Sequence, residues 1–142
     1  QTRAVKRVLS ILLLPAALIG SGCFGGTQPY ELDTPEGAIS EYLRVQAEGD
    51  VEGFCRVLSK DSQVYLLLSL GAGKFDCVGA LQARGEDMTR VMNTTAEYLR
   101  LKEIKRIKPG LARAYFDSSK GLTTRDLVFE RGLWRVEFNP GS

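Results

Sequence analysis

The chain has 142 residues, of which 44% are hydrophobic and 25% charged, and its formal net charge is +2. These are ordinary values for a globular protein and suit one domain with a modest core. The sequence contains no histidine, which excludes Ser-His-Asp and Cys-His catalysis and every histidine-ligated metal site. We expect no metal and no cofactor.

The first 22 residues have the features of a secretory signal peptide. They begin with a basic segment that contains Arg3, Lys6 and Arg7. An apolar run over residues 8–19 follows, which is far shorter than the roughly 20 residues that a membrane-spanning helix needs. Small residues close it, as they do before a signal cleavage site. We expect residues 1–22 to be cleaved from the chain.

Cys23 directly follows these small residues. The stretch Leu18-Ile19-Gly20-Ser21-Gly22-Cys23 resembles the lipobox of bacterial lipoproteins, in which an aliphatic and two small residues precede the cysteine. Here the aliphatic residues stand one or two places early. The resemblance implies that Cys23 carries lipid, including palmitate, and anchors the protein at the extracytoplasmic face of the bacterial cell membrane. Ordinary secretion, a retained membrane anchor and a cytosolic segment are the alternatives.

Two further cysteines, Cys55 and Cys77, remain as a pair. Disulfides persist in the oxidising compartment that the leader indicates, and the two are too far apart for a CxxC motif. We therefore expect a Cys55–Cys77 disulfide, with two buried free thiols as the alternative. Cleavage also removes three basic residues and no acidic one, so the rest is about neutral and gives no reason to expect a nucleic acid partner.

Residues 23–33 are rich in glycine and polar residues and are expected to form a flexible tether. Thr34-Pro35-Glu36 then predicts a helix start, because Thr caps amide groups, Pro fits the first turn and Glu complements the dipole. This helix should end at residues 48–50, where Asp50 caps a second, short helix. The expected inward positions of the two helices are Ala38, Ile39, Tyr42, Leu43, Gln46, Phe54, Cys55, Val57 and Leu58.

The middle of the chain is harder to interpret. Residues 59–61 are expected to form a turn, and the leucine-rich residues 64–70 fit either a helix or a buried strand. A glycine-containing break follows at residues 71–73. Residues 75–92 predict one helix, weakened at its centre by Gly85. Its expected apolar positions are Phe75, Val78, Leu81, Met88 and Val91.

Four strands are predicted after residue 96, where the apolar period changes toward two. The first has an imperfect alternation that indicates a bulge. Turns are expected at Pro109-Gly110, at residues 118–121 and at Arg131-Gly132. The expected faces are Ala112, Ala114 and Phe116 on the second strand, Thr123, Arg125, Leu127 and Phe129 on the third, and Trp134, Val136 and Phe138 on the last.

Helices followed by hairpin-connected strands predict an α+β domain over residues 34–142, with N-terminal helices packed on the concave face of a curved four-stranded antiparallel sheet. The order of Thr34-Pro35-Glu36-Gly37-Ala38, Glu48-Gly49-Asp50, Cys55, Leu58-Ser59, Cys77 and Gly132-Leu133-Trp134-Arg135-Val136 resembles the nuclear transport factor 2-like superfamily, a cone-shaped fold. It is most similar to small lipoprotein domains of actinobacteria. The resemblance implies a cavity between sheet and helices, which binds apolar ligands, hosts catalysis or is filled with side chains.

Three groups of residues are candidates for function. A set of aromatic residues either lines a ligand pocket or belongs to the core: Tyr42, Phe116, Phe129, Trp134 and Phe138. An acid-base pair would come from Asp126, Tyr42 and Tyr115, although Asp126 alternates with apolar residues and should face solvent. A basic strip at Lys102, Lys105, Arg106 and Lys108 either meets anionic lipid or polymer or protects an edge strand.

The sequence therefore predicts a non-enzymatic lipoprotein whose domain binds a small apolar ligand or an envelope protein. The lipid on Cys23 would hold the protein at the membrane. We expect no catalytic residue. The alternative is an enzyme of the isomerase or hydratase type that uses the cone as its active site.

Overall fold

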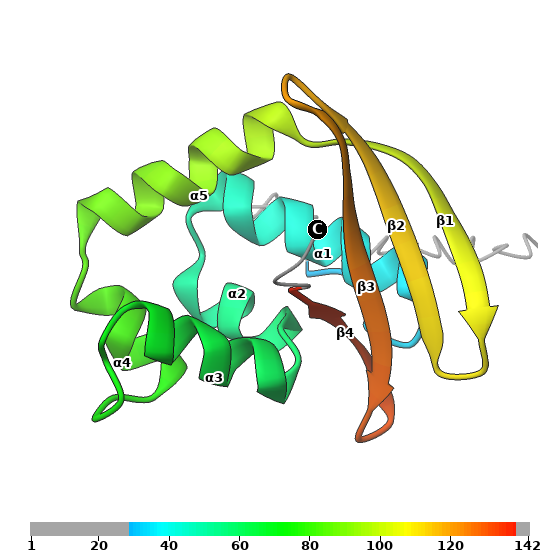
Figure 1. Cartoon of the computed structure of the whole chain (residues 1–142). Coiled ribbons are helices and arrows are strands. Elements are labelled where there is room, and N and C mark those ends of the chain that lie inside the picture. Colours follow the sequence, from blue (N-terminus) through cyan, green and yellow to red (C-terminus); the bar gives the residue numbers. More distant parts are fainter. Residues whose placement is uncertain (1–28, 139–142) are drawn as a thin grey trace, which may run out of the picture.

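The computed structural model describes residues 29–138, so the signal peptide, Cys23 and most of the expected tether lie outside the described residues. Within this range the expected α+β class is confirmed, since five helices precede a four-stranded antiparallel sheet. Figure 1 shows the helices gathered on one side of the bent strands. The elements are α1 (Pro35–Glu48), α2 (Val51–Val57), α3 (Lys60–Ser69), α4 (Cys77–Gln82), α5 (Glu86–Tyr98), β1 (Arg100–Lys108), β2 (Leu111–Ser118), β3 (Gly121–Glu130) and β4 (Leu133–Glu137).

Helices α1 and α2 begin where their capping residues predicted. The side chain of Thr34 accepts a hydrogen bond from the amide of Gly37, and that of Asp50 accepts one from Gly53. Helix α1 ends at Gly49, whose φ of 66° is the left-handed conformation that glycine adopts without strain. The three expected inward positions of α2 are buried, and so is the residue that follows this helix: Phe54, Cys55, Val57 and Leu58.

Helix α3 corrects the turn that we expected at residues 59–61. Ser59 is the N-cap of this helix, and its side-chain oxygen accepts a hydrogen bond from the amide of Ser62. The leucine-rich segment is therefore helical. Its apolar residues surround the helix instead of following one face, so several remain in solvent, namely Val64, Tyr65 and Leu68.

The prediction of a single helix over residues 75–92 is wrong. The segment forms two helices, α4 and α5, and the chain breaks at Gly85, whose φ is 57°. Phe75 precedes the cap of α4 and is exposed, and the expected inward residue Val91 is also exposed, while its neighbour Met92 is buried. Helix α5 then continues to Tyr98, past the expected start of the first strand.

The sheet has the order β1-β2-β3-β4, with every neighbouring pair antiparallel. The expected bulge in the first strand is confirmed, since the register of β1 against β2 shifts between Leu101 and Glu103 and again between Arg106 and Lys108. Strand β1 pairs only with β2, so it is an edge of the sheet. Its residues Lys102, Lys105 and Lys108 are exposed, which discourages pairing with another strand.

The core lies between α1, α2 and the inner face of the sheet. Ala112, Ala114, Phe116, Leu127 and Val136 are fully buried there, as the alternation of the strands predicted. Burial of such side chains supplies the main driving force for folding. Helix α5 packs on α1 and passes over it toward the sheet (Figure 1).

Strand β4 is joined to the helices by backbone contacts. Val136 forms a parallel bridge with Leu58, and its carbonyl accepts a hydrogen bond from the amide of Ser59 at 2.8 Å. The amide of Phe138 donates to the side-chain oxygen of Ser62 at 2.7 Å. The junction of α2 and α3 therefore covers the outer edge of β4.

The folded domain begins before Thr34. Leu32 is buried, and its carbonyl accepts a hydrogen bond from the amide of Trp134 at 2.8 Å. The amide of Tyr30 donates to the carboxylate of Glu41 at 2.9 Å. These contacts place residues 30–32 in the domain, whereas we expected them in the tether.

Candidate ligand-binding cleft

A cleft of about 790 Å³ lies between the C-terminal end of α5 and the β2–β3 hairpin. These two segments lie at the same end of the molecule in Figure 1. The volume is within the roughly 300–1,000 Å³ of small-molecule sites. The lining comes from α5 and the residue after it (Thr94, Thr95, Tyr98 and Leu99), from the hairpin (Ser118, Ser119 and Lys120) and from β3 (Thr123 and Arg125).

Arg125 is the one arginine among these lining residues. Strand β3 turns it toward the helices, because it alternates with Leu127 on the inner face and pairs with the small residue Ala114. Its Nε lies 3.4 Å from the hydroxyl oxygen of Tyr42, and its Nη1 donates to the carbonyl of Thr124 at 2.8 Å. The side chain is thus held by α1 and by its own strand.

Within the described part of the chain, no acidic side chain balances the charge of Arg125. Over residues 29–138, no carboxylate lies within ion-pair distance of its guanidinium group. The group instead lies over the ring of Phe138, 5.6 Å from the ring centre. A partly buried cation with this surrounding is unusual, because burial of charge is costly without a counter-ion.

The remaining polar groups of the cleft are hydroxyls and one more cation. The hydroxyls belong to Thr94, Thr95 and Thr123 and to the two serines of the hairpin. The further cation is Lys120, at the tip of the hairpin. A smaller hollow of about 330 Å³ adjoins the cleft and shares Tyr98, Ser118 and Ser119 with it. That hollow also contains Glu97, Arg100 and Asp117, so acidic groups stand beside the cleft and not in its lining.

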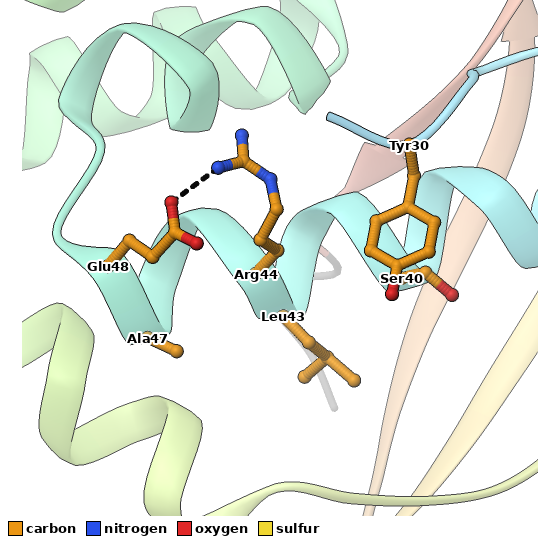
Figure 2. A pocket seen from close by; sticks show the side chains of 6 residues that line it. All are labelled: Tyr30, Ser40, Leu43, Arg44, Ala47 and Glu48. Atoms are coloured by element: carbon orange, nitrogen blue, oxygen red, sulfur yellow. Dashed lines mark hydrogen bonds and ion pairs between the residues drawn. The ribbon is translucent and has the colours of Figure 1, made fainter. Parts of the chain in front are cut away.

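A second hollow of about 400 Å³ lies along the side of α1, and Figure 2 shows it. Tyr30 lies next to Ser40 there, and Arg44 points away from Leu43 and toward Glu48. Arg44 forms ion pairs with Glu41, Glu48 and Asp50. These partners raise its pKa above the ordinary arginine value. The charge of Arg44 is therefore balanced by carboxylates of the protein itself.

Glu41 is the centre of this ion-pair network. It is fully buried and accepts hydrogen bonds from Arg44, from Arg56 and from the amide of Tyr30. Burial alone raises the pKa of its carboxyl, but these donors and the charge of Arg44 outweigh burial and hold the pKa below its usual value. We did not single out Glu41 from the sequence, because a glutamate in a helix usually faces solvent.

The aromatic residues expected to line a pocket lie mainly in the core. Tyr42, Phe116 and Trp134 are buried, and Phe138 is partly buried against the same core. Phe129 is 52% exposed and packs its ring on Trp134, with 5.6 Å between ring centres. The cleft between α5 and the hairpin is lined by other residues, and Tyr42 reaches it only through the contact of its hydroxyl with Arg125.

The three acid-base candidates do not come together. Asp126 lies on the sheet face opposite Tyr42 and is paired with Arg113, at 2.5 Å between Oδ1 and Nε. Tyr115 is on the same outer face as Asp126, under the ammonium group of Lys105. Tyr42 packs inside against Phe54. Asp126 is only 14% exposed, although it lies on the outer face.

The basic strip of β1 is divided between two faces of the sheet. Lys105 faces outward, where it pairs with Glu103. Arg106 faces inward, where it lies over the ring of Trp134 and bonds to Glu36 in the first turn of α1. It therefore links the edge strand to α1 and is not part of a continuous basic surface.

The disulfide between Cys55 and Cys77 is present, which confirms the expected pairing. The two Cα atoms are 5.9 Å apart, within the usual range for a bridge. Cys77 is the first residue of α4, and the bond fixes that helix to α2.

No protein-family model, curated protein or solved structure matches the chain. Among residues 29–138, no group of histidine, cysteine or acidic side chains is arranged to hold a metal ion. Within the same range, no helix combines the length and apolar character that crossing a bilayer requires.

Proposed function

We propose that this chain is a lipoprotein of the extracytoplasmic face of the bacterial cell membrane, anchored through Cys23, and that its domain is a non-enzymatic binding module of the nuclear transport factor 2-like cone type. The leader ahead of Cys23 supports export. The disulfide supports it independently, because such bridges persist outside the cytoplasm. The helices packed on one side of the antiparallel sheet support the cone.

The cleft of about 790 Å³ is the observation that carries the binding role. It lies between the end of α5 and the β2–β3 hairpin, and its size suits a small molecule. An isomerase or hydratase of this shape would need a carboxylate that faces the cavity. The lining residues of the cleft supply hydroxyl groups and two cations instead, which favours binding over proton transfer.

Native mass spectrometry of the purified full chain tests this function. We expect a co-purified small molecule that adds to the mass of the protein. Thr123→Tyr should abolish this adduct, because Thr123 lines the cleft and a tyrosine would fill it. Leu122→Tyr is the matched control, since the neighbouring side chain is exposed on the other face of β3. An adduct that survives Thr123→Tyr, or no adduct at all, would contradict the proposal.

A further inference from the structure

We propose that the ligand of this cleft is an amphipathic anion, a molecule with a carboxylate or phosphate head group and a short apolar body, and that Arg125 binds the head group. The inference rests on the proposed function and names the chemical class of its ligand. It follows from the charge balance of the cleft, from the donors that Arg125 leaves unused and from the character of the neighbouring side chains.

Three partly buried arginines among residues 29–138 line hollows of the domain, and they differ in their partners. Arg135 shares its hollow with Glu130 and donates a hydrogen bond to the carbonyl of Arg56. Arg44 has three carboxylate partners. Arg125 has no carboxylate partner within residues 29–138. Folded proteins pair charges that they take out of water, so Arg125 is a cation whose partner is to be supplied from outside residues 29–138. A negatively charged ligand meets this requirement.

The guanidinium group of Arg125 also has donors to spare. It carries five N–H groups, and the described contacts use Nε toward Tyr42 and Nη1 toward the carbonyl of Thr124. The contact with Tyr42 is long, at 3.4 Å. Nη2 has no hydrogen-bond partner among residues 29–138. A planar fork with free donors is the geometry that binds carboxylate or phosphate oxygens in pairs.

The surroundings favour an anion at this place. Lys120 adds a second positive charge to the lining, and no carboxylate belongs to it. The C-terminal end of α5 contributes a partial negative charge of about half a unit. The adjoining hollow adds Glu97, Asp117 and Arg100, and with these counted the positive charges still exceed the negative ones. The hydroxyls of Thr94 and Thr123 offer further hydrogen bonds to head-group oxygens, whereas the hydroxyl of Thr95 donates to the carbonyl of Val91.

The apolar part of the proposed ligand is inferred from the side chains that α5 contributes to the cleft. Leu99 and Tyr98 line the cleft where α5 ends, and the threonines add methyl groups. Tyr98 is exposed, so a ligand that covers it would remove apolar surface from water. An inorganic anion would make no apolar contact with Tyr98 and Leu99. A purely apolar molecule would place no negative charge beside Arg125.

Isothermal titration calorimetry with four decyl probes tests the inference. The full chain carries Cys23→Ser so that no detergent is needed, and the probes are decanoate, decyl phosphate, decanol and decyltrimethylammonium. We expect the two anions to bind at least tenfold more tightly than the alcohol and the cation, because a hydrogen bond to a charged group is worth about a tenfold change or more. The tighter anion identifies the head group.

Variants at Arg125 locate the contact. Arg125→Gln should weaken binding of the anions about tenfold or more and leave decanol unchanged, and Arg125→Lys should retain part of the affinity. Lys102→Gln removes the same charge from an exposed position on β1 and should have no effect. Thermal unfolding shows whether each variant is folded, and the exposed Lys120→Gln gives a second reduction in anion affinity without a change in the core.

Equal affinity for all four probes, or anion binding that Arg125→Gln and Lys120→Gln leave unchanged, would overturn the inference and leave the binding role intact. The absence of binding by every probe, with the native mass adduct still present, would likewise overturn the anion and spare the proposed function. Only loss of the adduct as well would overturn both.

Discussion

Both carboxylate oxygens of Glu41 accept hydrogen bonds from the guanidinium group of Arg44, one turn later on α1. Nε lies 2.8 Å from one oxygen and Nη2 lies 2.6 Å from the other. Glu41 is fully buried, and the side chain of Arg44 is only 8% exposed. The same carboxylate binds Arg56 of α2 and the amide of Tyr30, so it joins three segments of the chain.

Glu41→Gln should strongly destabilise the domain. Removal of one partner from a buried ion pair costs about 3–5 kcal/mol, and we expect the lower value because Arg44 keeps its contacts with Glu48 and Asp50. Urea unfolding measures the change. Glu97→Gln, an exposed glutamate on α5, is the matched control. A loss no larger than that of the control would show that the network contributes little to stability.

The ion-pair network should also make stability depend on pH in the acid range. The folded state lowers the pKa of Glu41, so its contribution is complete above the unfolded value of about 4.3. It is lost as the pH falls through the lower pKa of the folded state. Urea midpoints between pH 6 and pH 2 should fall more steeply for the natural chain than for Glu41→Gln. Parallel curves would contradict this assignment.

Ionisation of Glu137 should lower stability, whereas ionisation of Glu41 raises it. Burial, and then the charges of Asp61, Asp126 and Glu130, raise the pKa of the Glu137 carboxyl. Its ionisation therefore costs stability, and this cost appears as the pH rises through the unfolded value of about 4.3. Glu137→Gln should stabilise the domain at pH 7 by roughly 0.5 kcal/mol and have no such effect at pH 3. Destabilisation at pH 7 would refute this prediction.

Loss of the disulfide should cost about 3 kcal/mol in the chain-entropy model, because the bond closes a loop of moderate length. The variant is Cys55→Ala with Cys77→Ala, and its urea midpoint is compared with that of the oxidised chain. Reduction of the natural chain should give a similar loss. Two alkylatable thiols at these positions in protein taken from the cell envelope would instead show that the bridge does not form there.

Cys23→Ser should release the protein from the membrane. The lipid on this residue is the anchor that we propose, because buried acyl chains hold a soluble domain at a membrane surface. Fractionation should move the variant from the membrane to the soluble extracytoplasmic fraction. Cys23→Ala should give the same result. Persistence of either variant in the membrane fraction would argue for an anchor other than lipid on Cys23.

The sequence predicted those parts of the fold in which local chemistry and burial agree. Thr34 and Asp50 are good capping residues at the starts of helices, and both do cap them. Ala112, Ala114 and Phe116 alternate strictly and are buried together. Where the two signals disagreed, the prediction was wrong: the apolar spacing of residues 75–92 suggested one helix, and Gly85 ended it.

The cleft was only partly visible in the sequence. The alternation of β3 placed Arg125 on the face of Leu127, and an arginine at an inward position was the available signal. Its meaning depended on Tyr42 and Phe138, which lie far away in the sequence. The network of Glu41 could not be predicted, because periodicity does not show that Arg44 and Arg56 converge on one carboxylate.

The contact of β4 with the junction of α2 and α3 has a consequence for the order of assembly. A growing polypeptide makes the helices first, yet the amide of Ser59 and the side-chain oxygen of Ser62 also bond to Val136 and Phe138, which are made last. The early half of the domain thus stays incomplete until the last strand has been synthesised. The export that we propose would carry the chain across the membrane before it folds, and such late closure suits that order.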